Sequence, residues 1–308
     1  PKLLNTAQYI IDKKLAQMIF TGSSARKLRK HNDFNLLPGR LTLIRLDTLS
    51  YTEHKNENIE ELLLYGELPG ILSEKSKVHR NTDLDSYVTT YLEEEIRKEA
   101  ATKNLPAFYR FLELASLESG KIVSLRQIGS EIGVSHHAVG SYFEILEDSL
   151  ITIRIDPYSL SSTRKKLTKS SKYLFFDLGV RRLAAREGVR LGRPRLGELF
   201  EQYVGLELYR LIHFHESRLA LNFWRDPDGP EVDWLLRGPH QLTPIEVKYK
   251  ERIEKSDCRH LEVFLKEYKE AKRAYVICLT ERPYKITNKI TALPWQMIEN
   301  IFTDLEKE

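Results

Sequence analysis

Two short stretches of the chain carry side chains that could act together in hydrolysis. The first is EVD at 231–233, and the second is EVK at 246–248, where Glu246 follows Asp233 by thirteen residues. Both stretches lie in predicted strands that a short polar turn joins. Side chains two residues apart on a strand point to the same face. If the strands pair, Asp233 and Glu246 converge and Lys248 lies beside them.

A carboxylate pair with a neighbouring lysine suits magnesium-dependent chemistry. Magnesium prefers oxygen ligands, needs only one or two carboxylates and retains bound waters. The ion lowers the pKa of a bound water and neutralises charge that develops on a phosphodiester. We therefore predict Asp233 and Glu246 as ligands of Mg (or Mn). Lys248 would assist the attacking water or stabilise negative charge. Glu201, on the preceding helix, would orient a second water.

The alternative for the same residues is an ordinary solvated strand face. Cross-strand pairs of glutamate and lysine are common and contribute only ~0.2–1 kcal/mol each. The order of the surrounding elements favours the site. A helix near 196–215 precedes strands near 219–225, 231–237 and 243–250. A helix near 258–271, a strand near 274–280 and a short terminal helix follow. This order predicts an α/β domain over 179–308.

The central part of the chain has the pattern of a winged helix-turn-helix, predicted over 96–178. Two amphipathic helices meet at the turn 133–135, and strands near 151–155 and 172–180 follow. The loop between these strands is basic, and we expect it to contact the DNA backbone without reading sequence. The alternative is a packing module with a solvated tip. The expected DNA-contacting residues are Arg164, Lys165, Lys166, Lys169 and Lys172.

The first 55 residues predict a helix and two buried strands, at 17–24 and 39–50. These elements cannot cover both faces of a parallel sheet, so we expect only the distal part of an α/β domain. Residues 56–95 are predicted as a helical lid or linker.

The composition indicates a globular protein with several domains. Of 308 residues, 41% are hydrophobic and 30% are charged, and the formal net charge is +4. This mild excess of positive charge permits nucleic-acid binding without requiring it. No apolar run is long enough for a membrane helix. The two cysteines have no metal-ligand spacing, which favours reduced thiols and a cytoplasmic location.

The motifs in their order resemble the PD-(D/E)XK, or restriction-endonuclease-like, superfamily. They are most similar to the C-terminal domain, of unknown function, in a group of prokaryotic P-loop (AAA-type) ATPases. The motifs that carry the resemblance are FWRDPDGPEVDWLL, PIEVK and LFFDLGV, with TGSS and LPGR upstream. The resemblance implies an α/β fold in three parts: a partial P-loop ATPase remnant, a winged helix-turn-helix and a restriction-endonuclease-like α/β/α domain. It implies that Asp233 and Glu246 are metal ligands, that Lys248 is the catalytic lysine and that Glu201 is the acidic residue on the preceding helix.

The chain contains no G-x-x-x-x-G-K-[ST] phosphate loop. In the resemblance, Ser23 corresponds to a sensor of the γ-phosphate and Arg40 to an arginine near nucleotide charge. The simpler interpretation, which we favour, is that the TGSS segment is a turn with a helix N-cap and that Arg40 is a surface residue. We expect no ATP hydrolysis by this chain alone, and ATP binding only if a partner supplies the missing half. A homo-oligomer is the other possible assembly. The alternative function is a non-catalytic DNA-binding or protein-interaction module with a degenerate nuclease fold.

Overall fold

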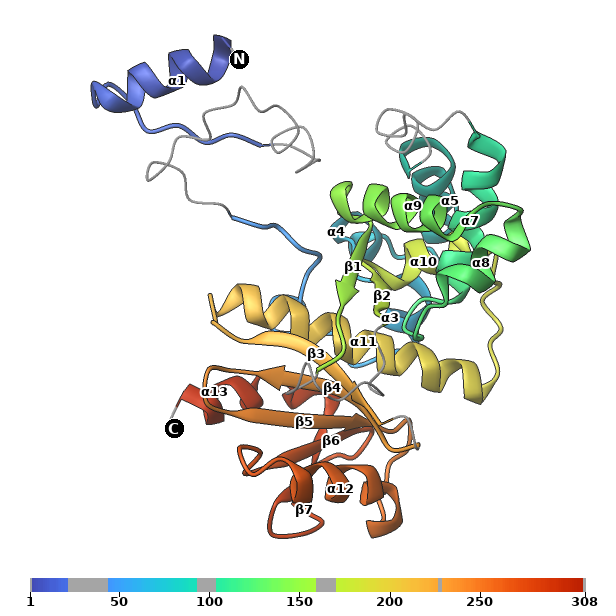
Figure 1. The fold of residues 1–308 in the computed structure, drawn as a ribbon, viewed down its shortest axis with the longest axis vertical. Helices are drawn as coiled ribbons and strands as arrows, with labels where there is room; N and C mark the ends of the chain where they lie inside the picture. The colour runs from blue at the N-terminus through green and yellow to red at the C-terminus, as the bar shows by residue number, and fades with distance from the viewer. Residues whose placement is uncertain (1, 22–43, 93–103, 159–169, 227–228, 307–308) are drawn as a thin grey trace.

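The computed structural model describes residues 2–21, 44–92, 104–158, 170–226 and 229–306. Figure 1 shows a helical body at the top and a body built on a β-sheet below it. The long helix α11 (Arg193–Phe214) lies between the two bodies. The fold is mixed α/β.

The lower body contains a six-stranded mixed sheet in the order β3-β4-β5-β6-β8-β7. Strands β3, β4 and β5 are antiparallel neighbours, β5, β6 and β8 are parallel, and β7 is antiparallel to β8. The strands are β3 (Ala220–Arg225), β4 (Glu231–Arg237), β5 (Leu242–Val247), β6 (Ala274–Cys278), β7 (Tyr284–Lys285) and β8 (Ile290–Pro294). Strands β7 and β8 were not predicted from the sequence.

Helices cover both faces of this sheet. Helix α12 (Arg259–Glu267) packs on one face through Leu261 and Phe264, against Leu235 and Val276. Helices α11 and α13 (Asn300–Glu306) belong to the core on the other face. Short 3-10 turns precede α12 and α13, namely η2 (Lys255–Cys258) and η3 (Trp295–Met297). Both faces are buried, which explains the almost continuous apolar runs in the central strands.

The upper body places two helices at a tight turn beside a two-stranded ribbon. Helix α8 (Leu125–Ile132) ends at Gly133, whose φ of 76° is left-handed, a conformation that glycine adopts readily. Helix α9 (His136–Asp148) begins where the side chain of Ser135 accepts a hydrogen bond from Ala138 N. The ribbon pairs β1 (Thr152–Ile155) with β2 (Lys172–Phe175) in antiparallel register.

The remaining helices of the upper body surround these elements. Helix α7 (Leu105–Leu117) packs against α8 and α9 through Phe108 and Phe111. The others are α3 (Ile59–Tyr65), α4 (Pro69–Ser73), α5 (Lys77–Ser86), the π-helical turn η1 (Tyr87–Leu92) and α10 (Leu178–Ala184). None of the described helices is long and apolar enough to cross a membrane.

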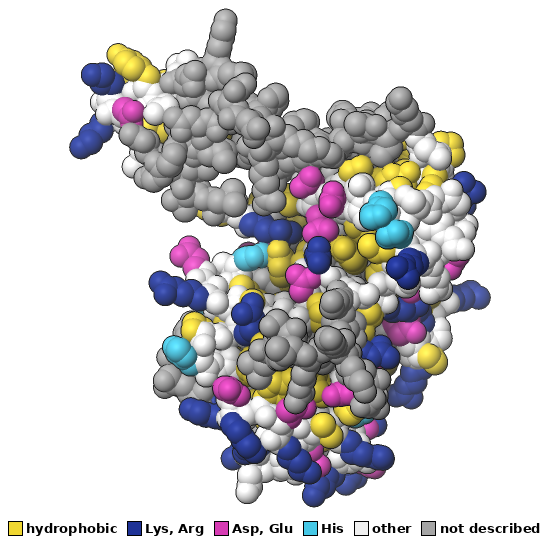
Figure 2. Space-filling view, in the orientation of Figure 1, with side chains coloured by type: hydrophobic (Ala, Val, Ile, Leu, Met, Phe, Trp, Pro, Cys, Tyr) yellow, Lys and Arg dark blue, Asp and Glu magenta, His cyan; other side chains and the backbone are white. Residues whose placement is uncertain are grey.

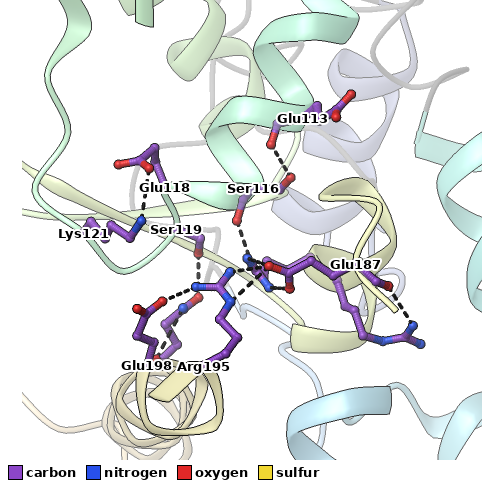
Figure 3. A network of polar contacts seen from close by, with 11 residues as sticks. Glu113, Ser116, Glu118, Ser119, Lys121, Glu187, Arg195 and Glu198 are labelled. Atoms are coloured by element: carbon purple, nitrogen blue, oxygen red, sulfur yellow. Dashed lines mark hydrogen bonds and ion pairs between the residues drawn. The ribbon is translucent and has the colours of Figure 1, made fainter. Parts of the chain in front are cut away.

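A polar network joins the helical body to α11 (Figure 3). Arg181 of α10 is fully buried; it donates to Ser116 O at 2.7 Å and forms an ion pair with Glu187. Glu187 also accepts a hydrogen bond from Arg195 Nε of α11 at 3.0 Å. Because one carboxylate binds arginines from two helices, α10 and α11 are held in a fixed relation.

The N-terminal expectation is correct for the helix and wrong for the described parts of both strands. Helix α1 (Lys2–Asp12) forms as predicted. Residues 16–21 and 44–47 have no strand assignment, and the exposed fractions of Ile19, Ile44 and Leu46 are 93%, 83% and 95%. A strand requires hydrogen bonds to a neighbouring strand. None of the strands in the described part of the chain pairs with these residues.

Candidate functional site

Strand pairing brings Asp233 and Glu246 together. In the register of β4 and β5, Trp234 lies opposite Ile245, so the next position places Asp233 opposite Glu246. Asp233 Oδ2 accepts a hydrogen bond from Val247 N at 2.8 Å, which fixes the carboxylate against the end of β5. Both carboxylates are buried, with exposed fractions of 7% and 4%.

Lys248 follows β5 directly and lies at the rim of the site. Its backbone N donates to Ile277 O at 2.9 Å, which continues the parallel pairing with β6 by one residue. Its Nζ lies 2.6 Å from Glu246 Oε1, and its side chain remains 30% exposed. The second carboxylate oxygen, Glu246 Oε2, is buried without a hydrogen-bond partner among the described residues.

Helix α11 presents Glu201 to the same cluster. Trp234 Nε1 donates to Glu201 O at 3.0 Å, which fastens the helix to β4. A Cβ at Gly205 would lie 2.5 Å from the Trp234 ring, so glycine permits this close approach of helix and strand. Glu201, Asp233 and Glu246 are hereafter the acidic cluster. Glu201 interacts electrostatically with both other members.

The expectation for Lys172 is wrong, because this residue does not lie in the basic loop. It is the first residue of β2 and is only 7% exposed. Its Nζ lies 2.9 Å from Glu201 Oε1 and 4.9 Å from the centroid of a Trp234 ring. The lysine therefore cannot contact a DNA phosphate from this position. Its place after a run of serines and basic residues resembled a loop, whereas the apolar residues that follow it continue a buried strand.

Burial and mutual repulsion control the ionisation of the site. Burial, followed by the charges of Glu246 and Glu201, raises the pKa of Asp233 well above its ordinary value. Burial also raises the pKa of Glu246, although Lys248 opposes this change. Burial alone would lower the pKa of Lys248, but Glu246 and Asp233 raise it overall. The lysine therefore keeps its positive charge beside the carboxylates.

The donor set fits a cation that takes few protein ligands. In the described residues, no group of three or more His, Cys, Asp or Glu side chains is arranged to hold a metal ion. Two carboxylates are nevertheless sufficient for magnesium, which retains waters at its other positions. Glu246 Oε2 is an acceptor without a partner among the described residues, and Asp233 uses one oxygen for Val247 N. Asp233 and Glu246 are thus the residues that would hold such an ion.

A second buried polar group, which no sequence pattern indicated, lies on the other side of α11. Arg210 forms ion pairs with Glu67 and with Glu207, the latter at 3.2 Å, and donates to Leu49 O at 2.6 Å. Glu207 Oε1 accepts from Tyr51 N at 2.9 Å. Glu67, Glu207 and Arg210 are hereafter the arginine cluster. Helical periodicity marked α11 as amphipathic but gave no sign that charged residues would lie in its buried face.

Six predicted residues lie outside the part of the chain that the structure describes. They are the four loop residues expected to contact DNA and the two expected to approach nucleotide: Arg164, Lys165, Lys166, Lys169, Ser23 and Arg40.

Two family models match separate parts of the chain, and both are described as domains of unknown function. DUF8612 matches residues 56–189, and DUF4143 matches residues 196–298. The second match contains Glu201 and the strands that carry Asp233 and Glu246. Neither description names a nuclease or a nucleotide-binding loop.

The chain is also similar to two uncharacterized mycobacterial proteins. One is from Mycobacterium bovis and the other from Mycobacterium tuberculosis, and each is 22% identical over 253 residues. The alignment covers 80% of this chain and 56% of each relative, so the chain spans about half of their length. A crystal structure of a Vibrio cholerae protein gives a TM-score of 0.26 at 14% identity, covering 82% of this chain and 57% of that one. A score this low does not indicate a shared fold.

Proposed function

We propose that the chain is a DNA-associated protein whose C-terminal domain hydrolyses phosphodiesters with Mg or Mn. Asp233 and Glu246 would hold the ion. Lys248, whose ammonium lies at the rim, approaches the attacking water and the phosphate. The bound ion would supply a water of lowered pKa and neutralise charge on the phosphate. The observation that carries the hydrolytic function is the convergence of two buried carboxylates and one partly exposed lysine at the end of β5.

The arrangement of elements supports a restriction-endonuclease-like domain and a winged helix-turn-helix. A sheet covered by helices on both faces, with the acidic residues on neighbouring strands and Glu201 on a packed helix, agrees with a restriction-endonuclease-like domain. Two helices at a tight turn followed by a ribbon agree with a winged helix-turn-helix. The match of residues 196–298 to a domain of unknown function agrees with the resemblance of this part of the sequence to a C-terminal domain of unknown function.

Basic surface on the C-terminal body supports an association with DNA. Figure 2 shows many lysine and arginine side chains over the lower body. A hollow of about 780 Å³ near the starts of β6 and β8 is lined partly by Lys272, Arg273, Lys285 and Lys289. Such residues can neutralise phosphates and make binding sensitive to salt.

The test is cleavage of supercoiled plasmid with Mg or Mn by the wild type, Asp233→Asn and Lys248→Met. The asparagine of the first variant keeps an oxygen for Val247 N but loses the charge that binds the ion. We expect both variants to lower the cleavage rate by about a hundredfold or more. Glu118→Gln is the matched control, because Glu118 is exposed and its ion pair with Lys121 involves no member of the cluster. Wild-type cleavage that persists in Asp233→Asn would come from a contaminant or another site.

A non-catalytic binding module is the second candidate, and one observation favours it. Each of two cluster carboxylates already contacts an ammonium group, Glu201 through Lys172 and Glu246 through Lys248. Charges satisfied within the chain do not require a metal. This candidate predicts salt-sensitive DNA retention in a mobility-shift assay that Asp233→Asn leaves unchanged, with no cleavage by any variant.

A further inference from the structure

Lys172 brings a positive charge from the upper body into the acidic cluster of the lower body. It belongs to β2, whereas its partner Glu201 lies on α11. Its Nζ also lies 5.3 Å from the centroid of the Phe223 ring on β3 and 4.9 Å from that of Trp234 on β4. The ammonium is therefore enclosed by a carboxylate and two aromatic faces, a setting that stabilises a cation.

Without a metal ion, the formal charges in this region come closer to balance with Lys172 than without it. Glu201, Asp233 and Glu246 carry three formal negative charges, and Lys248 supplies one positive charge. A divalent ion together with Lys248 would neutralise the cluster. Lys172 together with Lys248 nearly does so, and the addition of a divalent ion to both lysines would make the region positive. Buried charges of like sign repel strongly, because the surroundings screen them little.

We infer that Lys172 is an internal cation of the acidic cluster and that a divalent metal ion competes with it. The inference rests on the proposed function, since it assumes that Asp233 and Glu246 bind the ion. Because β2 carries the lysine, metal binding and the docking of the β1–β2 ribbon oppose each other. Such coupling is reciprocal. The factor by which the docked lysine weakens metal binding equals the factor by which bound metal weakens docking of the ribbon.

The test is Mn²⁺ affinity by isothermal titration calorimetry in the full chain. Lys172→Met keeps an unbranched apolar side chain over the aromatic rings but removes the charge. We expect it to tighten Mn²⁺ binding by about tenfold or more. Lys172→Arg keeps the charge and retains wild-type affinity. Lys121→Met, which removes a lysine from an exposed ion pair with Glu118, is the matched control and has no effect.

A further variant and a further measurement keep the test decisive. If Lys172→Met does not fold, Lys172→Gln replaces it, since the amide can still donate to Glu201. Hydrogen exchange of β2 amides gives a readout independent of affinity, and we expect Mn²⁺ to speed it in the wild type and not in Lys172→Met.

The outcomes separate the inference from the proposed function. If Mn²⁺ binds the wild type in an Asp233-dependent manner and Lys172→Met binds no tighter, the competition is refuted and the metal site stands. If Mn²⁺ binds no variant, or if Asp233→Asn does not weaken its binding, the metal site itself is refuted together with the competition. Tighter binding in Lys172→Met that Asp233→Asn abolishes supports both.

Discussion

The acidic cluster and the arginine cluster lie against the same helix but differ in their access to solvent. In the arginine cluster, Arg210, Glu67 and Glu207 have side-chain exposures of 4%, 6% and 2%. At the acidic cluster, Glu201 and the neighbouring Lys248 are each 30% exposed at the rim, while Glu246 is 5% exposed. One group of charges is sealed, whereas the other opens outward.

The two clusters also differ in the groups that neutralise them. A single guanidinium binds both carboxylates of the arginine cluster and a backbone carbonyl, in a planar geometry suited to several partners. Two separate ammonium groups, on flexible side chains, serve the acidic cluster. Sealed charges held by one arginine suit a structural joint. A partly exposed rim and two separate cations suit a site that binds something. Substitutions that neutralise one member of each cluster test this distinction.

The largest effect is expected for Arg210→Met. The substitution leaves two buried carboxylates without their cation, and breaking a buried ion pair costs about 3–5 kcal/mol. Urea unfolding followed by circular dichroism would measure the loss of unfolding free energy. A loss below about 1 kcal/mol would show that the arginine cluster is not a structural joint.

The pH dependence of stability is the next largest effect. Burial raises the pKa of Glu67 from 4.5 to about 7, although Arg210 opposes the change. The folded chain therefore holds a proton that the unfolded chain releases, and stability falls as pH rises between these values. The upper bound from this group is about 3 kcal/mol. Glu67→Gln should flatten the pH dependence of the unfolding free energy between about pH 4.5 and about pH 7.5. The same substitution at the more exposed Glu118 should leave this pH dependence unchanged. An unchanged slope in Glu67→Gln would assign the titration to other groups.

Asp233→Asn should change the unfolding free energy less than Arg210→Met does, and should raise it where Arg210→Met lowers it. The introduced amide still accepts from Val247 N, and the change removes repulsion with Glu246 and Glu201. Stabilising substitutions commonly raise the unfolding free energy by about 0.5–2 kcal/mol. We expect a rise of about 1 kcal/mol in urea unfolding without added metal. A comparable fall would indicate that Asp233 is a structural residue, like Glu207.

The smallest effect is expected for an exposed ion pair. Arg154 and Asp156 are 2.8 Å apart, with side-chain exposures of 49% and 57%. Arg154→Met should change the unfolding free energy by less than about 1 kcal/mol in the same assay. A larger loss would mean that burial is not what separates the strong ion pairs of this protein from the weak ones.

Local sequence patterns predicted the elements around the acidic cluster. Alternating strands placed Asp233 opposite Glu246 and Lys248 beside it, because the period of a strand and the length of its turn fix the register. Gly133 and Ser135 marked the turn between α8 and α9, since each has a specific role at a helix end.

Features that depend on distant partners were not predictable in this way. The strands expected near Ile19 and Leu46 have the apolar composition of strands but no partner among the described strands. Lys172 looked like a loop residue because its counter-ion, Glu201, lies 29 positions away. The pairing of Glu67 with Arg210 joins residues 143 positions apart in the chain, which no local period can indicate.

The contact of the chain after β1 with strand β3 has a consequence for solubility. Tyr158 N donates to Phe223 O at 2.7 Å, and Pro157 forms a parallel bridge to Phe223, so this segment covers part of the outer side of β3. An uncovered edge strand is a template for pairing with another molecule. At the opposite edge, β7 is only two residues long, which offers little to pair with. A fragment beginning after the ribbon would bare its β3 edge and should aggregate more readily than the full chain.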